Sequence, residues 1–381
     1  MFPIPTMPIV VRPYSEEHVP AVRDFNRRLR AGGAPREFSF PESPVPRWLP
    51  RGEGRKVYNE FFLALEDGVV RGTYAVKTQE FSVAGEVRSI GFYHHPYSEG
   101  IVDRAYSAVG VLLLRDALRR QPELFALGMG GYDRPLPQML MAMKWAHFLV
   151  PFYFQVIHPG RFLRRMQGLR TTAFRRWMMD LGAFSGAGWL GIHAAQAWRR
   201  LSRGSRRRGV CVESVASFGD WADELWRECQ PHYSMVAVRD AGTLNVLFPP
   251  QNAKFLRLRI RHGSRTMGWA VVAERREENH PQYGDLRVGV ILDCLARPED
   301  APPVMAETAA ALAARGVDLI TSNQSHARWC RALEQAGFFA GPSNFIFAAP
   351  KILADRLQPF DQKKLTMHFT RADGDGLYQY L

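Results

Sequence analysis

One order of strand and helix signals occurs twice along this chain of 381 residues. Each copy opens with a short apolar run, at residues 10–12 and 210–212. A serine that suits a helix N-cap follows, Ser15 in the first copy and Ser217 in the second. A succession of signals that recurs in this way is typical of a duplicated unit, and the chain is long enough for two domains. The sequence therefore predicts two similar folds in one chain.

Three strands follow the first helix of each copy, and the first two carry a hairpin signal. The expected strands are residues 61–65, 72–76 and 89–94 in the first copy and residues 255–260, 268–271 and 288–293 in the second. A turn glycine separates the first two strands in both copies, Gly68 in one and Gly263 in the other. Each sheet is therefore expected to begin as an antiparallel meander.

Helices and strands alternate in the later part of each copy. The expected order is helix, strand, helix, strand, at residues 106–119, 124–128, 137–146 and 152–154 in the first copy and residues 303–314, 317–321, 327–336 and 345–347 in the second. This alternation implies right-handed β–α–β units and parallel pairing. The fold class is therefore α/β with a mixed sheet in each copy, and the last strand is expected to end its own copy.

A basic segment that contains tryptophans separates the two copies. The predicted division is an N-terminal domain at residues 1–165, a linker at residues 166–208 and a C-terminal domain at residues 209–381. Trp177, Trp189 and Trp198 lie in the linker among arginines. We expect a pair of helices packed between the domains. Peripheral contact of residues 167–208 with an anionic membrane is the alternative.

The charge and the cysteines limit the classes of function. The net charge of +13 favours anionic partners such as nucleic acid, phospholipid, coenzyme A or an acyl carrier protein. No helix-turn-helix, RNA-recognition or zinc-finger pattern is visible, so we expect no specific nucleic acid. The four cysteines lie far apart and form no metal-binding pair, so no metal is predicted. No secretory signal is visible, and a cytoplasmic location is expected, with the inner face of the membrane as the alternative.

Two stretches of the second copy carry a resemblance to a known family. The residues concerned are Asn323, Arg328 and residues 332–338, which end in Gly-Phe, together with residues 235–240, Leu244-Asn245, Phe248-Pro249 and residues 291–295. The first stretch resembles the fourth helix of the GNAT N-acetyltransferase superfamily. The others are similar to GNAT-like proteins of bacterial surface-polysaccharide loci, although Val246 stands where those proteins often have tryptophan. The chain thus resembles two tandem GNAT-like domains joined by a helical basic linker.

The resemblance implies an acyltransferase. Such an enzyme moves an acyl group from acetyl-CoA, a longer acyl-CoA or an acyl carrier protein to an amine or hydroxyl of a small or sugar-like acceptor. Two rival functions remain open. One is a binding or scaffold protein with two degenerate domains, and the other is an aminoacyltransferase of the FemAB kind, which also has two GNAT-like domains and depends on aminoacyl-tRNA.

The family binds the pantetheine arm along a splayed fourth strand and the pyrophosphate at a Gly-rich turn that starts the next helix. In the first copy the candidate cofactor-binding residues are Phe92, Arg104, Ser107, Val109 and Gly110, although the glycines do not have the spacing of the full family motif. In the second copy this turn contains Pro302 and Pro303, which lack N–H donors, and two carboxylates. The first copy therefore suits coenzyme A better than the second, and which copy is active stays open.

The candidate bases lie at the end of the same strand: His94, His95 and Glu99. A histidine titrates near neutral pH and can accept the proton of an amine. Because neighbouring residues of a strand point to opposite faces, we expect only one of the two histidines to face a cleft.

The remaining candidates are residues that donate a proton to the leaving thiolate or hold the acceptor substrate. The tyrosine that the family often carries on its fourth helix is replaced by Leu333 in the second copy, so Tyr132 is considered as the proton source in the first. Asp293 is the catalytic candidate of the second copy. The candidates for holding a polar acceptor are Arg239, Asn245 and Asn323, and the first two alternatively fix a loop.

Overall fold

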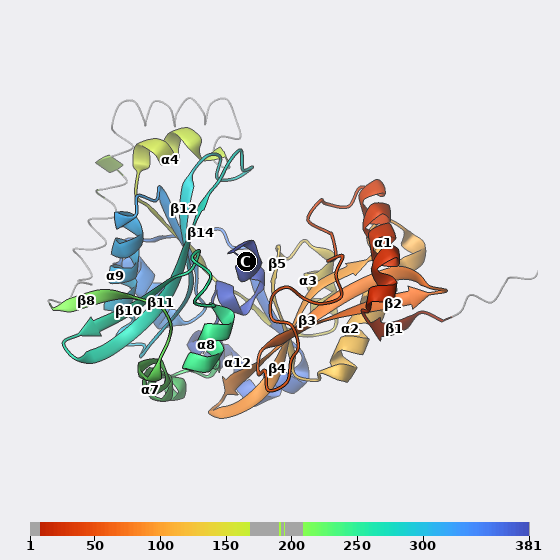
Figure 1. Cartoon of the computed structure of the whole chain (residues 1–381), viewed down its shortest axis with the longest axis horizontal. Coiled ribbons are helices and arrows are strands. Elements are labelled where there is room, and N and C mark those ends of the chain that lie inside the picture. The colour runs from red at the N-terminus through yellow and green to blue at the C-terminus, as the bar shows by residue number, and fades with distance from the viewer. Residues whose placement is uncertain (1–7, 168–189, 192–193, 195–208, 381) are drawn as a thin grey trace, which may run out of the picture. The chain divides into compact units, whose positions relative to one another are not determined.

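A computed structural model describes residues 8–167, 190–191, 194 and 209–380 (Figure 1). The chain forms two compact units, and each is described by itself. Unit 1 comprises residues 1–81, 86–147 and 346–356, and unit 2 comprises residues 82–85, 148–345 and 357–381. The predicted linker and its three tryptophans fall almost entirely outside the described residues.

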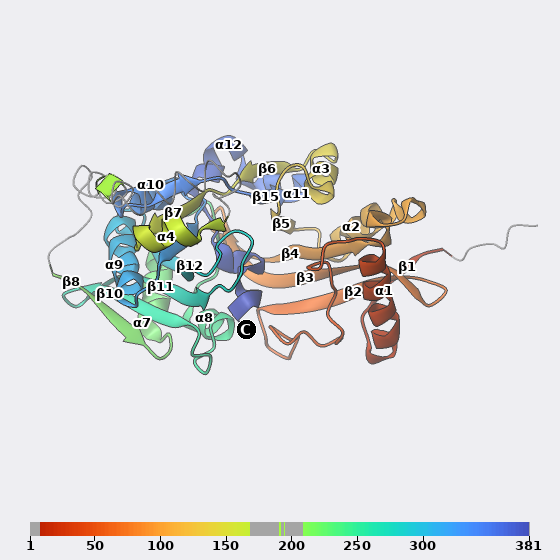
Figure 2. The ribbon, with the colours of Figure 1, turned by 90° about the horizontal axis from the view of Figure 1, so that it is seen from above.

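Unit 1 is built on a mixed sheet whose main path has the order β1-β2-β3-β4-β5-β15-β6. Its strands are β1 (Val10–Pro13), β2 (Tyr58–Glu66), β3 (Val69–Val83), β4 (Glu86–Ser98), β5 (Leu124–Met129), β15 (Phe345–Ala349) and β6 (Ala146–Leu149). β1 and β2 pair antiparallel, as do β2 and β3, whereas β4 and β5 pair in parallel. Figure 2 shows β2, β3 and β4 side by side. The tight turn between β2 and β3 contains Asp67 and Gly68, both with positive φ, as the hairpin signal requires.

Two helices cover the two faces of this sheet. The helices of unit 1 are α1 (Val19–Ala31), α2 (Val109–Arg120), α3 (Pro135–Ala142) and α11 (Lys351–Ala354), with 3-10 turns at Glu16–His18, Glu99–Ile101 and Arg104–Tyr106. α1 packs its apolar side against Phe61 and Leu63, whereas α2 packs against Phe62 and Ala64. Because these residues of β2 alternate, α1 and α2 lie on opposite faces of the sheet.

Unit 2 contains the second mixed sheet, in the order β14-β7-β13-β12-β11-β10-β8. Its strands are β14 (Phe339–Gly341), β7 (Phe152–Val156), β13 (Leu319–Asn323), β12 (Arg287–Ala296), β11 (Arg265–Arg276), β10 (Leu256–His262) and β8 (Val210–Val215). Antiparallel pairing joins β8, β10, β11 and β12, and parallel pairing joins β12 to β13. The two mixed sheets confirm the predicted fold class.

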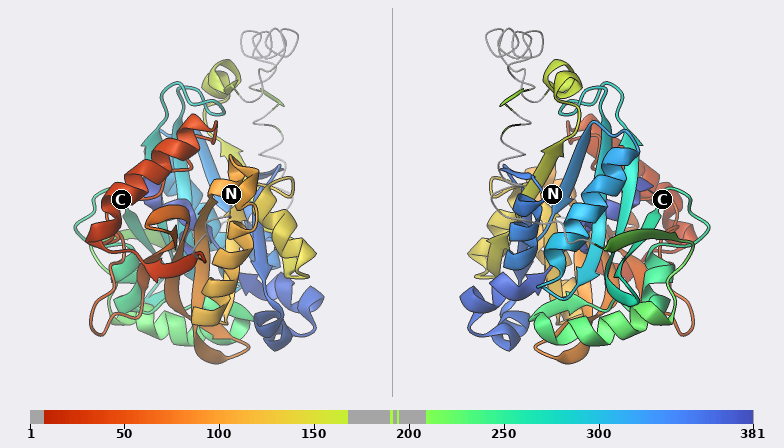
Figure 3. Two further views of the ribbon diagram at one scale, coloured as in Figure 1. Left: turned by 90° about the vertical axis from the view of Figure 1, so that its right-hand side faces the viewer. Right: turned by 90° about the vertical axis from the view of Figure 1, so that its left-hand side faces the viewer.

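Helices and a C-terminal segment complete unit 2. They are α4 (Pro159–Arg165), α7 (Asp220–Cys229), α8 (Ala241–Leu247), α9 (Ala301–Ala314), α10 (Ala327–Gln335) and α12 (Phe360–Lys363), followed by β16 (Met367–His368) and 3-10 turns at Arg371–Asp373 and Asp375–Tyr380. α9, the blue helix in the right-hand view of Figure 3, lies along the sheet and buries Val304, Met305 and Leu312. No helix among the described residues is both long and apolar enough to cross a membrane.

The closing strands do not end their own copies as the sequence analysis expected. β7, from the first half of the chain, pairs antiparallel with β13 in unit 2. β15, from the second half, lies between β5 and β6 in the other sheet, where Phe347 stacks on Phe125. An apolar pattern in the sequence identifies a strand, but it does not say which of two similar sheets the strand joins. With the closing strands exchanged, the two sheets have corresponding strand orders, in keeping with a duplicated unit.

Candidate functional site

The parallel strands at the centre of the first sheet part after a short paired stretch. Gly91 pairs with Leu124 and Phe92 pairs with Phe125, while β4 continues to Ser98 and β5 to Met129. Beyond Phe92 the backbone of β4 is therefore not paired with β5. At such an opening the N–H and C=O groups of the strand are exposed. An extended ligand can form hydrogen bonds with them in the way that a neighbouring strand would.

The two histidines of β4 meet at this opening. Their Nδ1 atoms lie 2.7 Å apart, and the Nε2 of His94 lies 3.0 Å from Oδ1 of Asn59 on β2. The expectation that the two rings face opposite sides of the sheet is wrong. His95 has φ of +50°, a left-handed conformation that breaks the alternation of the strand and turns its ring toward its neighbour.

This hydrogen-bond chain assigns a tautomer to each ring. The Nε2–H of His94 donates to Asn59, so its Nδ1 accepts a hydrogen bond from the Nδ1–H of His95. Burial, followed by the charges of His95 and Lys77, lowers the pKa of His94 well below its usual value, so His94 is neutral at pH 7. His95 is half-buried, and its hydrogen bond to His94 holds the ring in place.

A buried lysine lies beside this pair, and the sequence analysis did not single it out. Lys77 on β3 is 1% exposed and stands opposite Asn59 in the strand register. Its Nζ lies 5.3 Å from the ring centre of Trp48 and 5.6 Å from that of Phe92, within the range of cation–π attraction. Phe92 in turn stacks on His94 at 4.9 Å. The site thus places a neutral imidazole, a second imidazole and a buried lysine close together.

Glu99, the third predicted base, is held by arginines. Its carboxylate accepts hydrogen bonds from Nε of Arg28 at 2.7 Å and from Nη1 of Arg71 at 3.0 Å, and it is 5% exposed. Both oxygens of the carboxylate are therefore engaged by guanidinium groups. In this arrangement Glu99 fixes the turn between β4 and α2.

The start of α2 offers backbone N–H groups to an anion. The amides of Val111 and Leu112 both bond to the carbonyl of Ala108, and the first turn thus begins at residues 108–110. A side chain added at Gly110 would meet no atom within 4 Å, so the space beside it is open. Among the predicted cofactor residues, Arg104 and Ser107 are exposed, whereas the side chains of Phe92 and Val109 belong to the core.

Tyr132 lies in the loop that precedes α3, at the edge of a small apolar hollow. Its ring is 38% exposed and packs edge-on against His147 of β6, with 5.7 Å between ring centres. The hollow is lined by Met129, Leu140 and Trp145, among others. The placement leaves the phenol accessible to a ligand in unit 1.

The corresponding opening in unit 2 is filled by the chain itself. β12 pairs with β13 from Val288 to Ile291 and continues to Ala296 without that partner. The C-terminal segment enters there. His368 donates from Nε2 to the carbonyl of Cys294 at 2.8 Å, and the hydroxyl of Ser325 donates to the carbonyl of Met367 at 2.7 Å. Residues 367–369 thus contact both Cys294 on the unpaired part of β12 and Ser325, which follows β13.

An enclosed ion network anchors this segment. Arg239 forms ion pairs with Asp293 at 2.8 Å and with Asp373 at 2.7 Å, and all three side chains are 0% exposed. Thr370 donates to Asp293 at 3.0 Å. Burial above all, with Asp373 adding and Arg239 opposing, raises the pKa of Asp293 to about 6. The sequence-predicted Asp293 and Arg239 are therefore partners of each other, closed off from solvent.

The two predicted asparagines bind backbone. Asn245 accepts from the amide of Phe218 at 3.0 Å and donates to its carbonyl at 2.9 Å, which fixes the loop before α7. Asn323 donates to the carbonyl of Pro151 at 3.4 Å. The structure does not bring either of them into the network of Arg239.

Comparison with known proteins identifies the fold. No protein-family model matches the sequence, and no curated protein matches it by sequence. Among solved structures, the chain is similar to a conserved protein of unknown function from Enterococcus faecalis V583, described as a probable N-acyltransferase. It shares 9% identity with that protein at a TM-score of 0.50, over 92% of this chain and 74% of that one.

Saccharomyces cerevisiae N-myristoyltransferase, solved with bound myristoyl-CoA and inhibitors, is also similar, with 11% identity and a TM-score of 0.50 over 92% of this chain and 81% of that one. Identities this low show a shared fold and the fold alone.

Proposed function

We propose that this chain is an acyl-CoA-dependent acyltransferase and that its reaction takes place in unit 1, at the opening between β4 and β5. The observation that carries the proposal is the His94–His95 pair placed where β4 leaves its partner strand. The fold similarity to two acyltransferase structures supports the same class of reaction. The predicted location in the cytoplasm fits a reaction that consumes acyl-CoA.

The residues of unit 1 fit an acyl-CoA. The unpaired edge of β4 after Phe92 suits the amides of a pantetheine arm, and the open first turn of α2 at Gly110 suits a pyrophosphate. When bound, the group supplies an acyl carbon activated as a thioester. Acetyl-CoA and longer acyl-CoAs both fit this reasoning, and an acyl carrier protein presents the same arm.

His95 acts as the general base. Its Nε2 accepts the proton of the acceptor amine or hydroxyl as that group forms a bond to the acyl carbon, and it returns the proton to the sulfur as the carbon–sulfur bond breaks. The proton that leaves the acceptor is the one that reaches the sulfur, so the reaction needs no other proton donor and no oxidant. His94 and Asn59 would fix the ring of His95, and the buried Lys77 lies beside this group on the neighbouring strand.

The acceptor is proposed to be a small or sugar-like molecule with an amine or hydroxyl. The similarity of residues 235–249 to GNAT-like proteins of surface-polysaccharide loci supports this choice as an analogy. Unit 2, whose opening is filled by residues 367–373, is proposed to bind no acyl-CoA, so one acyl-CoA is expected per chain.

The test is release of free coenzyme A thiol from acetyl, octanoyl and palmitoyl donors, measured with a panel of amino sugars, sugar nucleotides and amines. For the His95→Gln variant we expect a fall in kcat of about 10² to 10⁴ with little change in KM for the donor. The matched control is His262→Gln, which changes an exposed histidine of unit 2. Equal rates in His95→Gln and wild type would refute the assignment. Failure of every donor to bind in calorimetry would refute the function itself.

A further inference from the structure

Unit 2 holds a second candidate site, a basic pocket of about 410 Å³. It forms where β11 runs on past the end of β10. Leu256, the first residue of β10, pairs with Val272, whereas β11 continues to Arg276 beside β12. One edge of β11 therefore borders the pocket from residue 273 onward. A volume of this size lies in the range of pockets that bind small molecules.

Five charged side chains line the pocket, and four of them are cationic. They are Lys254, Glu274, Arg276, Arg287 and Arg315. One carboxylate against the three arginines leaves a surplus of two positive charges among these four side chains. Apolar residues complete the lining, among them the buried Phe255, Val272 and Ala273. The pocket therefore offers a cationic wall beside an apolar surface.

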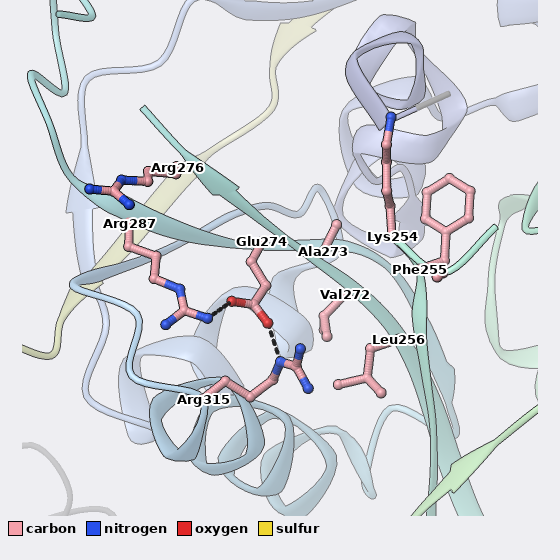
Figure 4. A pocket seen from close by; sticks show the side chains of 10 residues that line it. Lys254, Phe255, Leu256, Val272, Ala273, Glu274, Arg276, Arg287 and Arg315 are labelled. Carbon is pink, nitrogen blue, oxygen red and sulfur yellow. Dashed lines mark hydrogen bonds and ion pairs between the residues drawn. The ribbon is translucent and has the colours of Figure 1, made fainter. Parts of the chain in front are cut away.

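Glu274 positions two of the guanidinium groups. It accepts hydrogen bonds from Nη2 of Arg287 and from Nε of Arg315, which converge on it in Figure 4. Burial opposes its ionisation, but these hydrogen bonds outweigh burial and keep the pKa of Glu274 below its usual value. The carboxylate is thus charged at neutral pH and holds both arginines at the pocket.

Both arginines keep donors to spare. A guanidinium group has five N–H donors, and Glu274 takes one nitrogen of each group. Within the part of the chain that the structure describes, no other acceptor is assigned to the side chains of Arg287 and Arg315, and Arg276 makes no ion pair. Fixed guanidinium groups with open donors suit a tetrahedral oxyanion, since they bind its oxygens in pairs.

We propose that this pocket binds the phosphate group of a small organic phosphomonoester, with Arg276, Arg287 and Arg315 around the phosphate and the carbon part against the apolar lining. A phosphomonoester carries close to two negative charges at pH 7, which matches the surplus of the pocket better than a monocarboxylate does. The proposal is independent of acyl transfer, because it involves residues of unit 2 alone.

The experiment is calorimetry on the full chain without coenzyme A, with phenyl phosphate, inorganic phosphate and benzoate as probes. We expect phenyl phosphate to bind at least tenfold more tightly than inorganic phosphate, because it also covers apolar surface, and benzoate to bind most weakly. Arg276→Gln and Arg315→Gln are each expected to weaken phenyl phosphate by about tenfold or more, because each removes a charge-assisted contact.

Arg227→Gln, which removes an exposed arginine of α7, is the matched control and should leave binding unchanged. Thermal unfolding of each variant checks that the fold is intact. An equal loss in the control, or equal affinity for phenyl phosphate and benzoate, would mean unspecific attraction to a basic surface and would overturn the proposal. If neither phenyl phosphate nor inorganic phosphate binds, the proposal is also overturned. Such a failure would leave thiol release in the acyl-transfer assay unaffected, so the two proposals can be told apart.

Discussion

Replacing Arg239 by methionine tests how firmly the C-terminal segment closes unit 2. The guanidinium group is fully buried between Asp293 and Asp373, and each lies within 2.8 Å of it. Loss of one partner of a buried ion pair costs about 3–5 kcal/mol, because a charge remains without compensation. Arg239 has two partners, so we expect a loss at the upper end of that range. The assay is hydrogen exchange of the peptide that contains residues 367–380, together with urea unfolding.

The pH dependence makes this prediction specific. Without Arg239 the buried carboxylates must take up protons to stay buried, so the folded-state pKa of Asp293 rises further above its unfolded value. Stability then falls as pH rises, by up to about 1.4 kcal/mol per pH unit for each group. The Arg239→Met variant should therefore be closer to wild type at pH 5 than at pH 8. The triple variant that also carries Asp293→Asn and Asp373→Asn should recover most of the loss. A cost under about 1 kcal/mol, or one that does not change with pH, would refute the reasoning.

Three further predictions follow from single side chains. Burial lowers the pKa of His368 from 6.5 to about 4. Its contribution to stability is therefore complete above pH 6.5 and is lost as pH falls toward 4, about 3 kcal/mol in all. In the His368→Leu variant, the free energy of unfolding should not show this decrease between pH 6.5 and 4. Asn59→Leu removes the acceptor that sets the tautomer of His94. It should lower kcat about tenfold and shift the pH–rate profile. Unchanged kinetics would show that the hydrogen-bond chain from Asn59 through His94 to His95 has no part in the reaction. Gly110→Val adds a side chain in open space, so thermal stability should stay near wild type while KM for acyl-CoA rises, and an unchanged KM would place the pyrophosphate elsewhere.

Much of the fold could be predicted because local signals and tertiary structure agree. The hairpin of β10 and β11 follows from two alternating runs around Gly263, and α9 follows from an apolar stretch that begins with prolines. The destination of the closing strands could not be predicted. The runs at β7 and β15 are both short and apolar and begin with similar aromatic residues, so they are equally compatible with either sheet.

The candidate site was predictable in its residues but not in its geometry. His94 and His95 stand out as paired titratable residues at the end of a strand, but the left-handed φ of His95 that brings the rings together has no signal in the sequence. Lys77 and Asn59 were missed because a polar residue in a strand is read as solvent-facing unless its neighbours across the sheet are known. Only the register, which places Asn59 opposite Lys77, brings them to the same site.

The two copies differ in what occupies the gap between the parallel strands, and this difference is why the proposed reaction is assigned to unit 1. In unit 2 the helix that follows β12 starts with Pro302 and Pro303, which remove donors that a phosphate needs. A site that has lost its ligand leaves strand N–H and C=O groups buried and unpaired, which costs free energy. His368 satisfies the carbonyl of Cys294, and the ion network of Arg239 holds the C-terminal segment there. In unit 1 the strands part in the same way, but the histidine pair and the open turn at Gly110 are kept, and these are the features that a substrate requires.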